Sequence, residues 1–330
     1  MTTATAATNP TLADVAKLMD PDGKIDIVVE QMMKRSPLLK DATWVMGNLP
    51  TGHKFTSRTG LPSIGWRKFN EGINASKSRT QQITETCGML EGRAEVDSAL
   101  AELSGNPDAF RASEATAFLQ AFTHEIETGA FYHSTEATPE KFQGLTPRLD
   151  VIAGPYPNQI IDSSIAASGA DQTSMWFINW SPETVFMMYP KDSKAGLEHK
   201  DMGEEYVEDA DGKKFLALRD HWTWKVGMCV KDSRYLVRLC NIDTSAIAAT
   251  GKLLIQDMIK AAYALQDFSA GRTVIYCNRL VATYLHLQAQ DSAANSTLKI
   301  EQIEGQPVTT FMGMPIRWTD ALLNTEAIVT

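Results

Sequence analysis

The stretch PDAFRASEATAFLQAFTHEIET, residues 107–128, decides the architecture because it predicts one long helix. Asn106 precedes it and is a residue type that caps helix starts, and Pro107 suits the first helical position. Gly129 follows and favours an end there. At 1.5 Å per residue the helix would span about 33 Å. That is long for a chain of this size, so we expect the helix to be a main structural support of the fold.

The apolar residues of this helix form one stripe. Phe118, Phe122 and Ile126 recur every four residues, and Phe110 lies two turns before Phe118. Residues four apart lie on the same helical face, so this stripe should pack on a core.

On the N-terminal side of the helix, residues 47–93 are punctuated by glycine and carry no core pattern. They hold seven basic and three acidic residues, so this segment is basic inside an acidic chain. A long segment of this kind is typical of a functional projection or of a disordered linker. Trp66, Phe69 and Ile73 favour the projection, because linkers rarely carry large apolar side chains.

On the C-terminal side, residues 157–240 show strand patterns. Asp211-Gly212 predicts a hairpin turn, because such turns need positive φ. Residues 198–220 around it hold eight acidic and four basic residues, which indicates either a solvated face or a surface that pairs with the basic segment of a neighbouring subunit. The expected strands are 175–179, 184–189, 206–207, 215–218, 222–230 and 235–239.

Residues after 245 alternate helices and strands and predict an α+β or α/β module distinct from the strand-rich middle. The chain as a whole should be α+β, folded as one elaborated domain or two smaller ones. The expected elements are helices at 253–265 and 280–289 and strands at 273–277, 298–303 and 308–311, with a tail after Pro315.

The composition narrows the function. The 330 residues are 43% hydrophobic, which is enough for a sizeable core. The net charge of −9 argues against a protein whose main task is to grip nucleic-acid phosphates, although a surface that faces packaged DNA stays open. The amino terminus resembles no secretory signal and no apolar run approaches a membrane span, so we expect a protein that is cytoplasmic when made and has no membrane partner.

Enzyme signatures are missing from the sequence. The four cysteines and six histidines are scattered, with no zinc-ligand spacing and no short catalytic motif, so we expect no catalytic residues, metal or cofactor. The alternative is a dispersed site in which Cys229 or Cys240 works with His221 or His199 as thiol and base.

Several segments, taken together and in order, resemble the major capsid proteins of podovirus-type tailed double-stranded DNA phages. Each motif is weak alone, and the weight lies in their number and order. The segments are LPSIGWRKFNEG (61–72), FQGLTPRLD (142–150), YPKDSKAGLEHKDMGEEYV (189–207), RYLVRLCNID (234–243), GRTVIYCNRLVATYL (271–285) and GMPIRW (313–318).

The resemblance implies the capsid fold named after phage Hong Kong ninety-seven, and it divides the chain into four parts. Residues 1–45 would be an N-terminal arm and 46–95 an extended loop. Residues 96–244 would be a peripheral domain with long strands and a spine helix at 107–128, and residues 245–330 an axial domain. In the commonest arrangement the helix-strand segment at 277–318 precedes the long strands, whereas here it follows them. The connectivity is therefore expected to be permuted.

The resemblance also implies the task. Such a chain would self-assemble into pentamers and hexamers of an icosahedral virion shell around the DNA genome. A separate scaffolding protein and a portal would be partners, a decoration or cement protein a further one, and DNA would be contacted non-specifically. The alternative within the same fold is a nanocompartment that encloses protein cargo.

The candidate contact residues lie in the basic loop and in the acidic hairpin. The loop anchors would lie on a neighbouring subunit, or they would pack under their own loop; its basic residues would meet a subunit or the packaged DNA. The candidates are Trp66, Arg67, Lys68, Phe69, Ile73, Glu204, Glu205, Glu208 and Asp209.

Overall fold

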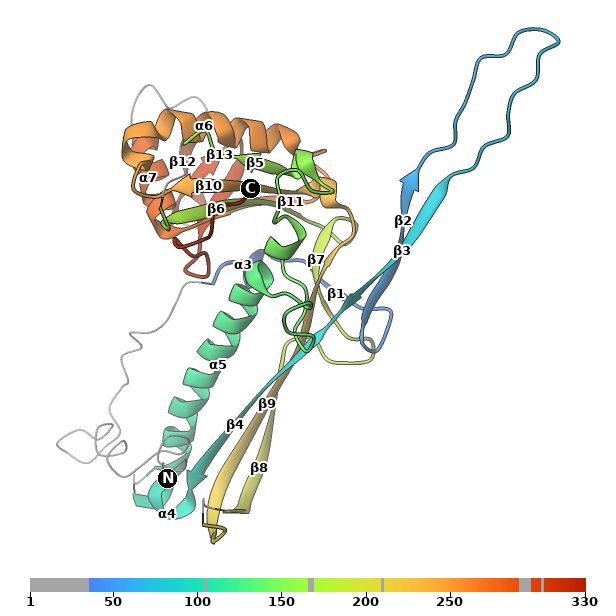
Figure 1. The fold of residues 1–330 in the computed structure, drawn as a ribbon. Coiled ribbons are helices and arrows are strands. Elements are labelled where there is room, and N and C mark those ends of the chain that lie inside the picture. The colour runs from blue at the N-terminus through green and yellow to red at the C-terminus, as the bar shows by residue number, and fades with distance from the viewer. Residues whose placement is uncertain (1–35, 104–105, 166–168, 209–210, 291–297, 304–305) are drawn as a thin grey trace.

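The computed structural model describes residues 36–103, 106–165, 169–208, 211–290, 298–303 and 306–330. Figure 1 shows a helix-covered sheet, a long helix with a strand sheet beside it, and a thin projection that leaves the body on one side. The expected mixed α+β class is confirmed. Most of the arm at 1–45 falls outside the described residues, and only its last part, from 36 on, is placed.

The long helix is α5, Pro107–Tyr132. Its predicted cap is confirmed, since the Asn106 side chain accepts a hydrogen bond from the backbone N–H of Ala109. The predicted end at Gly129 is wrong. A Cβ at Gly129 would meet the His133 ring at 2.3 Å, so this glycine makes room for a side chain one turn later and does not end the helix.

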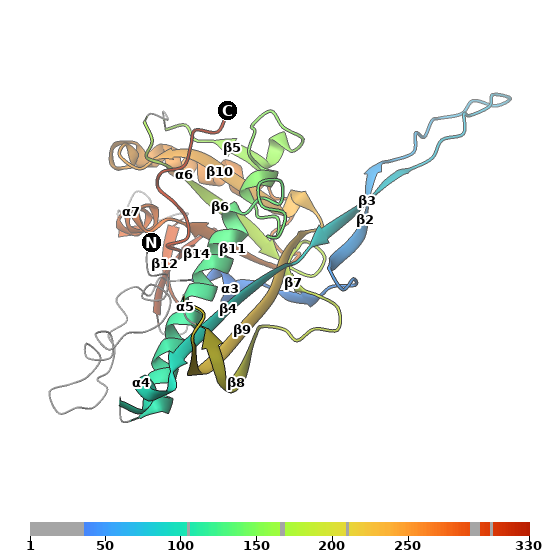
Figure 2. The same cartoon turned by 60° about the horizontal axis from the view of Figure 1, so that its bottom comes forward.

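A sheet of three long strands lies along α5: β4 (Gly88–Asp97), β9 (Lys214–Val230) and β8 (Leu197–Glu208), with β9 in the middle. The strands expected at 215–218 and 222–230 are one strand. Figures 1 and 2 both show the sheet running beside the helix. β4 pairs with β9 along its whole length, so residues 88–95 belong to this sheet and not to the projection.

The helix-covered part is built on β6 (Gln172–Trp180), which is buried throughout. It pairs with β10 (Leu236–Asp243) on one side and β11 (Arg272–Cys277) on the other. The remaining strands are β5 (Ile160–Asp162), β12 (Leu298–Ile303), β13 (Gln306–Phe311) and β14 (Met314–Trp318).

Two layers cover this sheet. Helices α6 (Ile247–Ala264) and α7 (Arg279–Gln290) bury one face, where Met175 and Phe177 point. The end of α5 and the chain terminus cover the other face, where Trp176 and Ile178 point. Since β6 and β10 are integral to the sheet, residues 245–330 do not form a separate module. Local periodicity could not reveal these long-range pairings.

The long strands and the helix-covered sheet are joined by β7 (Val185–Tyr189), which pairs with β9 and with β1 (Trp44–Met46). The short helix α3 (Leu38–Asp41) precedes β1. Short helical segments lie at Ser98–Leu103 (α4), Thr146–Arg148 (η1), Pro157–Gln159 (η2) and Ser233–Tyr235 (η3). None of the helices in the described ranges is long and apolar enough to span a membrane.

The projection is a two-stranded hairpin of β2 (Gly52–Gly60) and β3 (Arg79–Thr86). Residues 61–78 continue beyond both strands as its tip, and Figures 1 and 2 show the tip extending far from the rest of the chain. The projection predicted within residues 47–93 is therefore present, as the β2–β3 hairpin and its tip.

Candidate inter-subunit contact surfaces

The tip of the projection carries large apolar side chains that no described part of the subunit covers. Trp66 and Phe69 are 105% and 98% exposed, and Ile73 is 57% exposed. The idea that these three residues pack under their own loop is therefore wrong. Leu61 and Ile64 are as exposed and were not among the candidates, although they lie in the same glycine-punctuated stretch.

The tip keeps a defined path despite its exposure. The backbone N–H of Glu71 donates to the Lys68 carbonyl at 3.3 Å, and Asn70 takes the left-handed conformation with φ 63° that asparagine tolerates. The Ser76 hydroxyl donates to the Ser63 carbonyl at 2.7 Å and ties the two legs together. The tip therefore presents its aromatic side chains from a closed turn.

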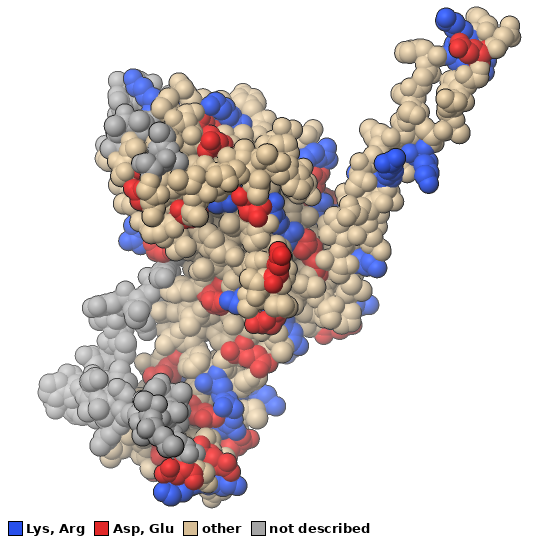
Figure 3. Space-filling model, viewed as in Figure 1, with Lys and Arg blue, Asp and Glu red and all other residues tan. Residues whose placement is uncertain are grey.

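Basic side chains surround these apolar residues. Arg67 and Lys68 are exposed beside Trp66 and Phe69. Figure 3 shows blue beside red at the far end of the projection and blue again part-way along it, and the tip also carries the exposed acidic residue Glu71. A partner surface would have to be both apolar and able to accept cations.

The base of the projection is anchored in the body. Phe55 is buried against Phe186, Met188 and Cys229 in a small apolar cluster. The carboxylate of Glu85 on β3 accepts two hydrogen bonds from the guanidinium of Arg148, at 2.5 and 2.8 Å. An apolar cluster and an ion pair thus join the hairpin to the body, and the Asn48 side chain holds the start of β2 through two hydrogen bonds with the Lys54 backbone.

The acidic candidates Glu204, Glu205 and Glu208 lie on β8, at the opposite end of the molecule from the projection. Glu205 forms an ion pair with Arg219, and Glu208 lies 3.6 Å from Lys214. Glu204 accepts a hydrogen bond from the Ser98 hydroxyl at 3.3 Å. These partners within the subunit reduce the charge that the hairpin can offer to a neighbour.

Two further facts concern this hairpin. Asp209 lies outside the described residues. The predicted hairpin is present and Gly212 has φ 78°, but the predicted two-residue turn is wrong, because the last paired residues are Glu208 and Lys214.

The long sheet is fastened to α5 by an ion network. The Arg111 guanidinium binds the Asp220 carboxylate through two hydrogen bonds, at 2.7 and 3.0 Å, and reaches Asp201 at 2.8 Å. His199 lies 2.8 Å from Asp220 and stacks on Trp222, whose ring also stacks on Phe118. His199 on the edge strand β8 therefore helps to pack that strand on β9, which argues for a structural role.

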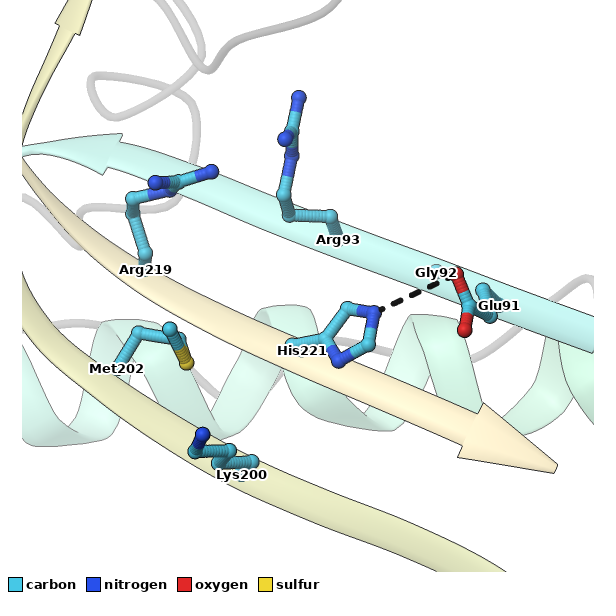
Figure 4. A pocket seen from close by; sticks show the side chains of 7 residues that line it. All are labelled: Glu91, Gly92, Arg93, Lys200, Met202, Arg219 and His221. Atoms are coloured by element: carbon cyan, nitrogen blue, oxygen red, sulfur yellow. Dashed lines mark ion pairs between the residues drawn. The ribbon is translucent and has the colours of Figure 1, made fainter.

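The face of the long sheet that points away from α5 is hollowed, with a cavity of about 530 Å³. Figure 4 shows His221 on β9 pointing toward Glu91 on β4, 3.7 Å away, with Arg93, Lys200 and Arg219 around them and α5 behind the sheet. Glu95 pairs with both Arg93 and Arg219. This hollow is open and its charges largely satisfy one another.

The thiols proposed for a dispersed enzyme site are inert. Burial raises the pKa of Cys229 to about 12 and that of Cys240 to about 11. Cys240 donates to the Ile161 carbonyl, whereas His221 faces Glu91 and His199 faces Asp220. In the described parts of the chain, no group of metal-ligating side chains is found.

A family model described as "Major capsid protein GP7" matches residues 20–330. The chain belongs to this family. It is a phage major capsid protein that assembles with copies of itself into an icosahedral shell and resides in the virion capsid; it is not an enzyme. The two alternative functions, a nanocompartment shell and a thiol enzyme, are therefore not supported.

Solved structures agree with this assignment. A chain of the near-atomic-resolution structure of bacteriophage Epsilon15 is 36% identical, with 98% of each chain covered and a TM-score of 0.80. The capsid of bacteriophage JBD30 shares the fold with a TM-score of 0.55 at 11% identity, over 94% of this chain and 99% of that one. The capsid protein therefore has the Hong Kong ninety-seven fold. No curated protein matched.

Proposed function

We propose that the tip of the β2–β3 projection is the main contact that each subunit lays on its neighbour within pentamers and hexamers of the shell. One observation carries this proposal: five large apolar side chains are exposed together at the end of a projection, and none of them is covered by the part of the chain that the structure describes. Such exposed apolar groups mark interaction sites in soluble proteins. They are Leu61, Ile64, Trp66, Phe69 and Ile73.

Shell geometry gives this contact its effect. In a closed ring each subunit uses one surface to bind the next and a different surface to be bound. A projection on one side of the body suits such a head-to-tail contact, and aromatic anchors dominate interface energetics. Many modest contacts then add up across a closed lattice.

The acidic hairpin takes a lesser part in the proposed contacts. Glu204, Glu205 and Glu208, with Asp209, would adjust register and partner choice rather than supply affinity, because Arg219 and Lys214 already lie beside Glu205 and Glu208.

Other partners follow from the task. A net charge of −9 suits a surface that encloses DNA without gripping it, so we infer non-specific contact with the packaged genome. A portal and a separate scaffolding protein complete the proposed set, and a decoration or cement protein is a further one.

The proposal is tested by replacing the tip anchors together, with Trp66→Ser, Phe69→Ser and Ile73→Ser in one chain. A matched control is Tyr263→Ser, since Tyr263 is 70% exposed near the end of α6 and is not part of the projection. Negative-stain electron microscopy and size-exclusion chromatography should find closed shells for the parent and the control, and unassembled, folded subunits for the tip variant. Normal shells from the tip variant would refute the proposal.

A further inference from the structure

Among the described residues, only the base of the projection contacts the body. A small tilt at the base therefore moves the tip by a large distance. Residues 56–82 are exposed or half-buried, while Phe55 and Glu85 are buried. From Phe55 to Phe69 an extended chain reaches roughly 45 Å, so a tilt of about 5° at the base moves the tip by about 4 Å. The contacts at the base therefore decide where the tip meets a neighbour.

Three kinds of contact hold the base. Two hydrogen bonds between the Asn48 side chain and the Lys54 backbone join β2 to the segment before it and do not reach α5. The apolar cluster around Phe55 is held by burial, which has little directional preference. The Glu85–Arg148 pair is directional, because a planar guanidinium and a planar carboxylate meet through two parallel hydrogen bonds. Both side chains are largely buried, at 9% and 16% exposed.

Arg148 is itself fixed to the end of the long helix. Its Nε donates to the Gly144 carbonyl at 3.0 Å and its Nη2 to the Gln143 carbonyl at 3.2 Å. The same loop is tied to α5, since the N–H groups of Gly144 and Leu145 donate to carbonyls at the helix end. A continuous set of hydrogen bonds thus runs from α5 through Arg148 to β3.

The Glu85–Arg148 pair should matter more for the orientation of the projection than for the stability of the subunit. A buried ion pair gains little over well-packed apolar residues of similar volume, because desolvation offsets the attraction. We propose that Glu85 and Arg148 are positioning residues that set the angle between the projection and α5, and thereby the curvature and uniformity of the shell. This inference rests on the proposed contact of the tip with a neighbour.

The test replaces the pair by apolar residues, Glu85→Leu with Arg148→Met. The thermal midpoint of unassembled subunits should change by less than about 4 °C, which is the scale of a 1 kcal/mol change in a protein of this size. Particles of parental diameter should fall at least tenfold in electron micrographs, replaced by tubes, open sheets or shells of mixed size. Arg148→Lys, which keeps the charge but loses the fork, should give an intermediate loss.

The angle itself can be measured without assembly. Spin labels on cysteines introduced at Ser63 and Thr116, in a Cys87→Ser background, should report one narrow distance distribution in the parent and a broad one in the Glu85→Leu, Arg148→Met variant. The exchange of Arg279 and Asp320, an ion pair at the start of α7, is the control and should leave both readouts unchanged.

Each outcome decides between the proposals. Parental shells or an unchanged distance distribution in the Glu85→Leu, Arg148→Met variant would overturn the positioning role. If that variant assembles normally while the tip variant does not, only the positioning inference fails. If the tip variant itself assembles normally, the proposed contact fails first.

Discussion

The same residue types have opposite fates at the two ends of this molecule. Phe122 and Trp222 are 4% and 2% exposed where α5 meets the long sheet, whereas Phe69 and Trp66 are almost fully exposed on the tip. The first pair lies in regular elements whose periodicity brings apolar groups onto one face. The second pair lies where no such period exists. The comparison suggests that one set of aromatic residues stabilises the subunit and the other joins subunits.

The largest effect on subunit stability should come from the buried side. Phe122→Ala removes a ring that packs against Ala94 and Trp222, and we expect a loss of about 3 to 5 kcal/mol in the free energy of unfolding. Urea unfolding of unassembled subunits measures it. Leu119→Ala, on the exposed side of the same helix, is the control, and equal unfolding midpoints for the two variants would contradict the division.

A second effect depends on pH. Glu127 on α5 is fully buried; its carboxylate accepts a hydrogen bond from the Thr319 hydroxyl at 2.8 Å. Burial raises its pKa to about 7, against hydrogen bonds from Ser36 and Thr319 that lower the pKa. Because the folded pKa is raised above the unfolded value of 4.5, the folded state holds a proton that the unfolded chain loses. Stability should therefore fall as pH rises from about 4.5 to 7.

Glu127→Gln removes this proton equilibrium and keeps the shape of the side chain. At pH 5 we expect stability close to that of the parent, and at pH 8 a gain of up to about 3 kcal/mol. Urea unfolding across this range provides the test. Exposed Glu140→Gln should keep the parental pH profile, and a Glu127→Gln profile that runs parallel to the parent would refute the role of burial.

A smaller effect should come from the start of the long helix. Asn106→Ala leaves the Ala109 N–H without its side-chain acceptor, and we expect a loss of about 1 kcal/mol. Asn106→Asp keeps an acceptor and should cost little. If Asn106→Ala and Asn106→Asp have the same unfolding midpoint, the cap does not stabilise the helix.

The smallest effect on subunit stability should come from the tip. Trp66→Ser with Phe69→Ser should change the free energy of unfolding by no more than about 0.5 kcal/mol, because both rings are almost fully exposed to solvent in the unassembled subunit. Chemical unfolding of the unassembled variant gives this value. A loss of several kcal/mol would mean that the tip packs on its own chain in solution.

The sequence predicted what local patterns determine. The cap at Asn106, the buried stripe of α5 and the exposed projection all follow from residue spacing or composition. The helix end at Gly129 was wrong because glycine also serves close packing, here against His133. β9 looked like two strands because Arg219, Asp220 and His221 interrupt its apolar run. Arg219 and His221 line the open face of the sheet, however, and Asp220 pairs with Arg111 on α5.

Long-range pairing was beyond local patterns. Nothing near β6 indicates that it will lie between β10 and β11, so the helix-covered part could not be delimited. One partner of the acidic residues could have been predicted from the sequence, since a hairpin around Asp211-Gly212 brings Glu208 near Lys214. The Glu85–Arg148 pair joins residues 63 positions apart and left no signal in the sequence.

The central claim, that the exposed tip joins subunits, is tested most directly by cryo-electron microscopy of the assembled shell at a resolution that reveals side chains. We expect Trp66 and Phe69 to be buried against a neighbouring subunit of the same capsomer. A closed shell in which both rings still face solvent would contradict it.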